Sequence, residues 1–198
     1  MGAGLIVKGE IDRSRDDAQF RSAQAALKLG MGVFDDLSDE IAATAGNDSA
    51  TSAPSTGGTT KSLDRPAIAR LRIATIGVDI ATLAFTGVDD LELGLTWMPD
   101  SAPLGTPGTS IVVGHRTLFG APLKEADQLV AGDEIEVTAA DGTRSTYVVR
   151  TKHIRRPQES FADLVSNADT QRLPLVTCHP EHSTEFRLLV VADAGGQG

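Results

Sequence analysis

Apolar side chains recur at helical spacing over the first part of the chain. Between residues 14 and 45 they stand three, four or seven positions apart, which predicts an amphipathic helix. They are Phe20, Leu27, Met31, Phe34, Leu37 and Ile41. Such a stripe favours an N-terminal helical segment, residues 1–45, that acts as a spacer rather than as a cofactor site. A separate hypothesis is that this segment docks over the following domain and restricts access to it.

The helical pattern ends in a stretch that has no large apolar side chain. Residues 46–62, GNDSATSAPSTGGTTKS, are rich in Ser, Thr and Gly, so they bury too little surface to offset the entropy of ordering. This composition predicts a flexible linker. The folded domain is then expected over residues 63–193, with a disordered tail at 194–198.

Short apolar runs separated by turn residues follow the linker. Residues 67–85 alternate around Gly77 and predict two strands or one bent strand, and TSIVVGH predicts a short buried strand that ends at His115. Residues 135–149 alternate on both sides of the dipeptide Asp141-Gly142, which predicts a β-hairpin with a type I′ turn.

The last third of the chain adds one expected helix and two expected strands. Residues 157–169 begin with a proline, carry acidic residues early and place apolar side chains on one side, which predicts a short helix. RLPLVTC and EFRLLVVA predict strands on either side of a polar loop. The fold class is therefore mainly β, with six to eight short strands and one or two short helices, and a closed barrel would protect the strand edges.

Charge and hydropathy exclude two classes of partner. The chain carries 27 acidic and 18 basic residues, a net charge of −9, whereas nucleic-acid binding needs a basic face. The one basic cluster, residues 150–156, is expected to be a solvated strand end. No apolar run approaches the roughly 20 residues that span a bilayer, so any membrane association is expected to come from a segment absent from this chain.

Three residues near predicted strand ends form a candidate site. Cys178, the single cysteine, ends an apolar strand, His115 ends another, and Arg187 lies in the strand that follows Cys178. Each has an ordinary alternative, because a free cysteine usually packs in a core, a histidine at a strand end is often solvated and a strand arginine often faces water. The site depends on all three lying together.

The chemistry of these three types is complementary. A thiol attacks as the thiolate, which a nearby imidazolium and guanidinium stabilise. The histidine can then protonate a leaving amine and later deprotonate an incoming one. The arginine can hold the substrate carbonyl or the oxyanion that forms from it.

Other candidate residues have weaker support. The four histidines lack the HExxH spacing of a helical zinc site, and a single cysteine provides no thiolate pair, so no metal or cofactor is expected. Calcium binding by Glu159 and Asp163, or by Asp89 and Asp90, lacks EF-hand spacing, and these carboxylates are expected to be solvated. His179 and His182 flank the cysteine, but the first should point away from it and the second lies in a loop.

The segments VVGHRTLFGAPLKEADQLVAGDEIEV, LPLVTCHP and EFRLLVVA, in this order and separation, resemble the sortases, cysteine transpeptidases of Gram-positive cell surfaces. The resemblance covers about residues 66–192. It places the family's histidine, cysteine and arginine on His115, Cys178 and Arg187. The family's TLxTC motif is matched from Leu175 onward, with Pro174 in place of its first Thr, which puts the local strand pairing in question.

This resemblance implies an eight-stranded sortase β-barrel that cleaves a C-terminal LPxTG-type or LAxTG-type sorting signal after Thr. A thioacyl enzyme forms on the cysteine and is resolved by an amine of a peptidoglycan precursor, or by a pilin lysine in pilus-building members. Thr177, beside the nucleophile, becomes a candidate substrate-binding residue. The implied partners are surface proteins with sorting signals, and the implied location is the outer face of the cell membrane.

The GHRT context of His115 and the HP after the cysteine are most similar to the actinobacterial housekeeping group called class E. A pilus-polymerising sortase is the first alternative, although the Asp-Pro-aromatic lid motif of many such enzymes is not found, and WMPD is not that motif. A non-catalytic surface β-domain on a stalk is the second, and it predicts a buried, inert Cys178. A papain-like enzyme is excluded, because there the cysteine precedes the histidine.

Overall fold

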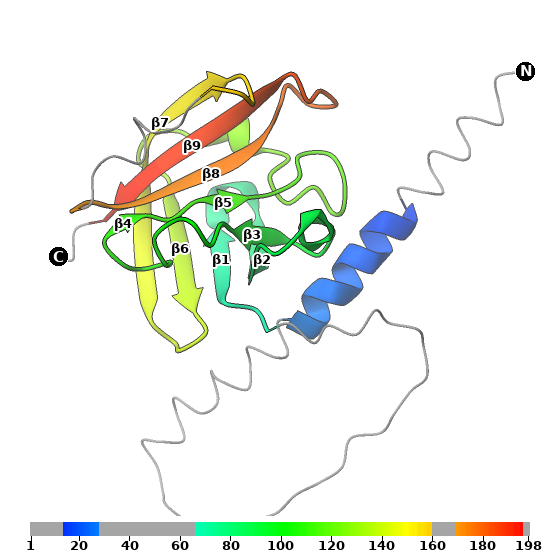
Figure 1. Cartoon of the computed structure of the whole chain (residues 1–198), viewed down its shortest axis with the longest axis horizontal. Helices are drawn as coiled ribbons and strands as arrows, with labels where there is room; N and C mark the ends of the chain where they lie inside the picture. The colour runs from blue at the N-terminus through cyan, green and yellow to red at the C-terminus, as the bar shows by residue number, and fades with distance from the viewer. Residues whose placement is uncertain (1–13, 28–65, 160–168, 196–198) are drawn as a thin grey trace, which may run out of the picture.

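Strands close into a barrel in the part of the chain that the computed structural model describes, residues 14–27, 66–159 and 169–195 (Figure 1). The strands are β1 (Ala69–Ile73), β2 (Val78–Ala84), β3 (Leu95–Trp97), β4 (Gly108–Thr109), β5 (Val112–Val113), β6 (Glu134–Ala139), β7 (Arg144–Arg155), β8 (Gln171–His179) and β9 (Phe186–Ala194). Short 3-10 turns connect some of them: η1 (Ala74–Ile76), η2 (Val88–Glu92) and η3 (Ala126–Gln128).

The sheet order is β4-β8-β5-β3-β2-β1-β6-β7-β9, and a further pairing of β8 with β9 closes the barrel. β4 and β5 lie on the same side of β8 and form one interrupted strand, so the nine segments make an eight-stranded barrel. Parallel pairs join β2 to β3 and β8 to β4 and β5, and the other pairs are antiparallel. The expected mainly β, closed barrel is confirmed.

The structure shows two turns that the sequence analysis addressed, one between β1 and β2 and one between β6 and β7. η1 and Gly77, at φ +65°, separate β1 from β2, so residues 67–85 form two strands. The hairpin of β6 and β7 is confirmed, but its turn is not type I′. Only Gly142 has a positive φ, and its N–H donates to the carbonyl of Ala139, which is a type I turn followed by a left-handed glycine.

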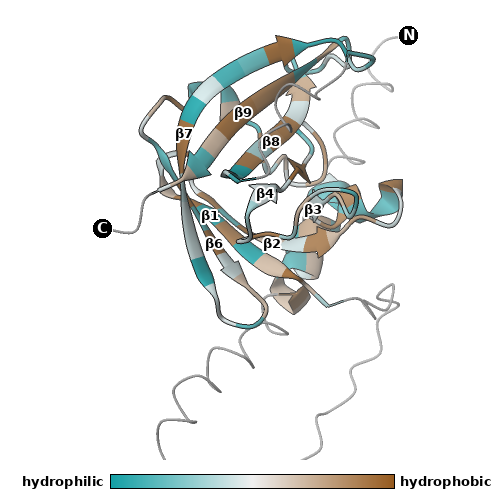
Figure 2. Cartoon of the chain, turned by 60° about the vertical axis from the view of Figure 1, so that its left-hand side comes forward, coloured by the Kyte–Doolittle hydropathy of each residue, from teal (hydrophilic) through white to brown (hydrophobic). Residues whose placement is uncertain are grey.

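Alternation along β8 and β9 divides their side chains between two apolar clusters. Leu173 and Leu175 of β8 face the main core inside the barrel, together with the fully buried Tyr147 of β7. Val176 faces the other side and packs with Leu189 of β9 in a smaller cluster. Figure 2 shows that hydrophobic residues occupy much of both strands. Burial of each such side chain contributes about 1.5–3 kcal/mol, so both faces of these two strands stabilise the barrel.

Pro174 keeps its pairing with β9 and interrupts the ladder on its other side. The carbonyls of Arg172 and Val176 accept hydrogen bonds from the N–H groups of Ser110 (2.8 Å) and Gly114 (3.1 Å), so alternate residues of β8 direct their backbone toward β4 and β5. A proline between them has no N–H to donate. Pro174 therefore leaves the pairing of β8 with β9 intact and coincides with the break between β4 and β5.

Residues 14–27 form a helix that packs against the barrel beside β2 and β3 (Figure 1). It buries Phe20, Ala23, Gln24 and Leu27. The other members of the predicted stripe, the linker at 46–62 and most of the helix expected at 157–169 lie outside the described residues. The domain boundaries therefore stay predictions. In the described part of the chain, no helix has the length and apolarity needed to cross a membrane.

Candidate active site

Three neighbouring strands bring the predicted site residues to one level of the barrel. β5 pairs in parallel with β8 as far as Val113 opposite Val176, and continuing this register by two residues would bring His115 level with Cys178. β9 pairs with β8 on the other side and sets Arg187 directly opposite Cys178. Cys178 thus pairs with Arg187 on one side, and His115 follows the strand on its other side.

Cys178 and Arg187 form a close cross-strand pair. The backbone of Cys178 faces β5 rather than β9, which makes the pair a non-hydrogen-bonded one, where Cα atoms lie about 4.5 Å apart and side chains approach most closely. Arg187 donates from Nη1 to the carbonyls of Thr184 and Phe186, both at 3.0 Å, which fixes the guanidinium. Among the described residues its Nε and Nη2 have no hydrogen-bond partner, so they can serve a ligand.

The site residues continue the apolar face of the outer cluster. Val176 lies two positions before Cys178, and Leu189 two positions after Arg187, and side chains two apart share a face of a strand. Ile111 and Val113 extend the cluster on the strand that leads to His115. The cysteine is free and partly exposed, as expected for a thiol at a strand end. These four apolar side chains form a surface, which we call the apolar floor, that leads along the strands toward Cys178, Arg187 and His115.

Thr177 faces the opposite side from Cys178. Its side chain is 2 % exposed, and its hydroxyl donates to the carbonyl of Gly114 at 2.9 Å. A Cβ on Gly114 would overlap the side chain of Leu95, so any larger residue there would require Leu95 to move. Thr177 thus fastens the residue before His115 to β8. Its expected contact with substrate stays a prediction, and the partner that the structure gives its side chain is the histidine segment.

Arg116 links the histidine and cysteine segments, a role that sequence reasoning missed. Its guanidinium is 3 % exposed, and Nη1 lies 3.4 Å from the carbonyl of Cys178 and 3.0 Å from Nδ1 of His179. Nη2 pairs with Asp127 at 2.8 Å, and Nε donates to the carbonyl of Lys124 at 3.2 Å. This side chain continues the β5–β8 ladder one step beyond the end of β5. Its only signal in the sequence was a charge directly after a strand end.

The less favoured residues lie away from the reacting groups. His179 contacts Arg116, and His182 is exposed in the turn after β8 with φ +61°. Asp90 is buried rather than solvated, because its Oδ2 accepts hydrogen bonds from the N–H groups of Thr86 and Gly87. That part of the carboxylate prediction was wrong. Within the described ranges, no group of three or more His, Cys, Asp or Glu side chains could hold a metal ion.

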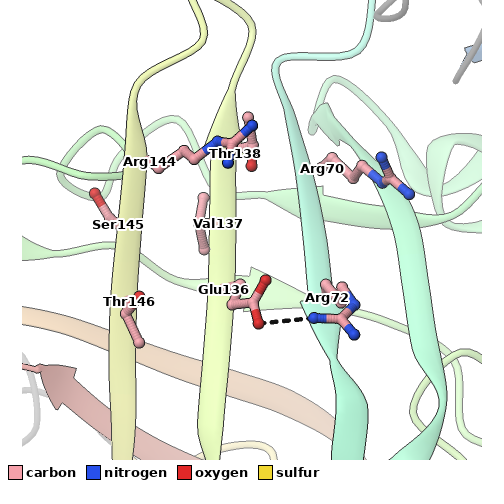
Figure 3. A pocket seen from close by; sticks show the side chains of 8 residues that line it. All are labelled: Arg70, Arg72, Glu136, Val137, Thr138, Arg144, Ser145 and Thr146. Carbon is pink, nitrogen blue, oxygen red and sulfur yellow. Dashed lines mark hydrogen bonds and ion pairs between the residues drawn. The ribbon is translucent and has the colours of Figure 1, made fainter. Parts of the chain in front are cut away.

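A second hollow, of about 270 Å³, lies on the outer face of β1, β6 and β7 (Figure 3). Its arginines are largely paired: Arg70 with Asp79 at 2.7 Å and Arg72 with Glu136 at 2.8 Å. None of the predicted site residues lines it.

Burial lowers the pKa of His115 below its ordinary value of 6.5, and the negative charge of Glu92 partly opposes this effect. The unfolded chain then binds this proton more tightly than the folded chain does. The free energy of unfolding should therefore fall as the pH drops through about 6.5 toward the folded pKa. His115→Asn should lose this part of the dependence. Urea unfolding of both proteins at pH 7.5 and 5 tests it, and equal pH dependence in the two would contradict it.

A cysteine opposite an arginine, with a histidine after the neighbouring strand of a closed β-barrel, is the arrangement expected of a cysteine-dependent acyl-transfer enzyme. Comparison with protein families matches the sortase domain to residues 71–194. The chain belongs to the sortase family, and it is therefore an enzyme of a cysteine transpeptidase family.

Solved sortase structures resemble this barrel. Sortase E from Streptomyces avermitilis is 30% identical, with a TM-score of 0.56 over 65% of this chain and 88% of that one. A lid mutant of sortase A from Corynebacterium diphtheriae is 27% identical, with a TM-score of 0.62 over 68% and 73%. Sortase C-1 from Actinomyces oris is 25% identical, with a TM-score of 0.61 over 69% and 79%. The search of curated proteins finds no match.

Proposed function

We propose that this enzyme cleaves a C-terminal LPxTG-type or LAxTG-type sorting signal after Thr and transfers the protein to a cell-wall amine. The observation that carries the proposal is the pairing of Cys178 with Arg187 on β9, next to the β5 strand that leads to His115. The apolar side chains that lead to these groups suit the Leu and Pro or Ala of such a signal. The substrates would be surface proteins displayed at the outer face of the cell membrane.

In the first half of the reaction, Sγ of Cys178 attacks the carbonyl carbon of the substrate Thr. Arg187 donates hydrogen bonds to the oxyanion of the tetrahedral intermediate. The C–N bond breaks as His115 gives its proton to the leaving amine, and a thioester remains on the enzyme.

In the second half, an amine attacks the thioester carbon. His115 accepts the proton that this amine loses, the C–S bond breaks, and the thiolate returns. A new amide joins the two molecules, so no oxidant, metal or nucleotide is consumed.

The housekeeping role of class E is supported by the GHRT and HP contexts and by the 30% identity to a Streptomyces sortase E. A pilin lysine is the alternative acceptor, favoured by the 25% identity to a sortase C. The non-catalytic surface domain required a buried thiol, and the partial exposure of Cys178 favours the enzyme instead.

Incubation with LPxTG and LAxTG peptides should produce a thioacyl adduct on Cys178 that mass spectrometry detects. Addition of an amine should release it as the transpeptidation product, and Cys178→Ala should form no adduct. The two peptides compared at equal concentration give the motif preference. No adduct with either peptide on folded wild-type protein would overturn the proposal.

A further inference from the structure

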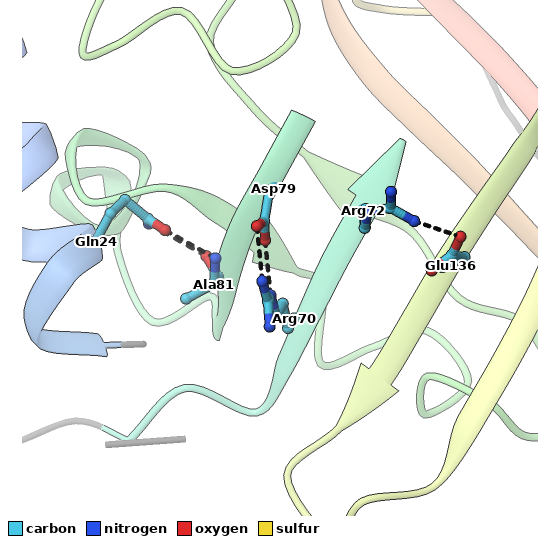
Figure 4. A network of polar contacts seen from close by, with 6 residues as sticks. All are labelled: Gln24, Arg70, Arg72, Asp79, Ala81 and Glu136. Carbon is cyan, nitrogen blue, oxygen red and sulfur yellow. Dashed lines mark hydrogen bonds and ion pairs between the residues drawn. The ribbon is translucent and has the colours of Figure 1, made fainter. Parts of the chain in front are cut away.

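The side-chain amide of Gln24, in the N-terminal helix, takes the place of a peptide group in the barrel sheet. Its Oε1 accepts the N–H of Ala81 at 2.7 Å (Figure 4). Its Nε2 donates to the carbonyl of Leu93 at 2.6 Å. β2 and β3 begin to pair only at Thr82 and Leu95, so the amide satisfies backbone groups just ahead of that ladder. These hydrogen bonds join the helix to the sheet, and Gln24, which makes them, is only 6 % exposed.

Two glycines make room for the buried face of this helix. A Cβ on Gly94 would overlap the amide nitrogen of Gln24, and a Cβ on Gly120 would overlap the ring of Phe20. The N–H of Gly120 also donates to Oδ1 of Asp17 at 3.1 Å. The barrel therefore carries two depressions that this helix fills.

The loop at Gly120 has an unfavourable backbone that needs support from outside. Phe119, Gly120 and Ala121 are consecutive residues in the left-handed region, with φ values of 49°, 71° and 45°. A left-handed backbone is costly for residues with a side chain and persists only where surrounding contacts enforce it. The helix supplies such contacts through Phe20 and Asp17.

The contacts made by Phe20 and by Gln24 both reach segments that hold a neighbour of the His115 imidazole. The ring of Phe119 packs on the ring of His115, with centroids 5.1 Å apart and planes tilted by 43°. On the other route, Gln24 holds Leu93, and the preceding residue, Glu92, carries the charge that acts on His115. Phe20 therefore supports the loop that follows His115, and Gln24 supports the residue next to Glu92, whose charge acts on His115.

We infer that the N-terminal helix is a fixed part of the active site, in which Phe20 and Gln24 position His115 for proton transfer. This inference rests on the proposed function for its catalytic consequence. It departs from both earlier expectations for the segment, a spacer and a cover. The helix makes hydrogen bonds to Ala81, Leu93 and Gly120, none of which is a reacting residue.

The test compares three variants of the full chain: Phe20→Ala, Gln24→Ala and the matched control Gln19→Ala, whose side chain is on the exposed side of the helix. A displaced general acid should lower kcat for thioacyl formation by about 10-fold in the first two variants. KM should change less than twofold, because the apolar floor lies elsewhere. The control should match the wild type. Unchanged kcat in both buried variants would overturn the inference.

A readout independent of activity is the NMR signal of the His115 imidazole, assigned with His115→Asn. Its chemical shift and titration should change in Phe20→Ala and Gln24→Ala and stay unchanged in Gln19→Ala. A wild-type protein that forms no adduct would overturn the proposed function, while this signal still decides whether the helix positions the histidine. An imidazole signal that does not respond to either buried variant would overturn the positioning role.

A double-mutant cycle tests the docking itself. Gly120→Ala should destabilise the protein by backbone strain and by collision with Phe20, whereas Phe20→Ala loses the packing of its ring and removes the partner in that collision. The double variant should then lose less stability than the sum of the two single variants. The backbone strain that Gly120→Ala introduces cancels in the cycle, because it is the same in the presence of Phe20 and in the Phe20→Ala background. Additive losses would mean that the helix does not dock on Gly120, and the inference would fail.

Discussion

Arg187→Ala should lower kcat/KM for thioacyl formation by about 10²–10³-fold, the usual cost of removing a donor that stabilises an oxyanion. The guanidinium stands opposite Cys178 and is held by the carbonyls of Thr184 and Phe186, with Nε and Nη2 left for the substrate. Arg187→Lys keeps the charge but loses the planar set of donors, so it should recover only part of the rate. Initial rates of adduct formation by mass spectrometry measure both effects.

The control for this experiment is Arg144→Ala, which removes an exposed arginine from the hollow of Figure 3. Its rate should equal that of the wild type. Alkylation of Cys178 by iodoacetamide, a reaction without an oxyanion, separates two roles of Arg187. An alkylation rate that stays near wild type in Arg187→Ala supports oxyanion stabilisation, and a parallel fall would assign the arginine to the thiolate instead. Peptide turnover within a few-fold of wild type would refute any direct role.

Arg116→Met should lower the free energy of unfolding by about 1.5–3 kcal/mol, the range for hydrogen bonds to a charged group whose acceptors are left unsatisfied. The guanidinium is 3% exposed, and its loss leaves the carbonyls of Cys178 and Lys124 without these donors. Adduct formation should also slow in protein that is still folded, because the end of β8 loses a support. Urea unfolding and rates measured well below the transition report the two effects.

The partner of Arg116 offers a graded comparison. Asp127 is 48% exposed, so Asp127→Asn should cost far less than Arg116→Met, since water replaces much of what the carboxylate provides. Arg116→Lys should fall between them, because an ammonium cannot reach all the acceptors of the fork at once. Equal stability of Arg116→Met and wild type would show that the guanidinium does not hold the two segments.

The sequence predicted those parts of the fold that depend on nearby residues. The apolar runs in RLPLVTC and EFRLLVVA placed β8 and β9 correctly, and they set Cys178 near a strand end. Turn geometry was harder, because Asp141-Gly142 also suits a type I turn with a left-handed glycine, which is what the hairpin of β6 and β7 adopts.

Contacts between distant segments could not be read from the pattern. The parallel register of β5 and β8 decides that His115 meets Cys178, and nothing in either strand alone specifies it. The same holds for Arg116, and for Gln24, whose amide bonds to a residue 57 positions away. Polar residues at such places look like surface residues until the fold supplies their partners.

The parallel pairing of β5 with β8 also decides when the enzyme becomes reactive. Thr177 and Gly114, which join the two segments, are 63 residues apart, and the hairpin of β6 and β7 lies between them in the chain. Contacts of such long range form late, because a large loop must close first. A nascent or partly unfolded chain thus carries the cysteine apart from the histidine proposed as its base, and it gains transpeptidase activity only when the barrel closes.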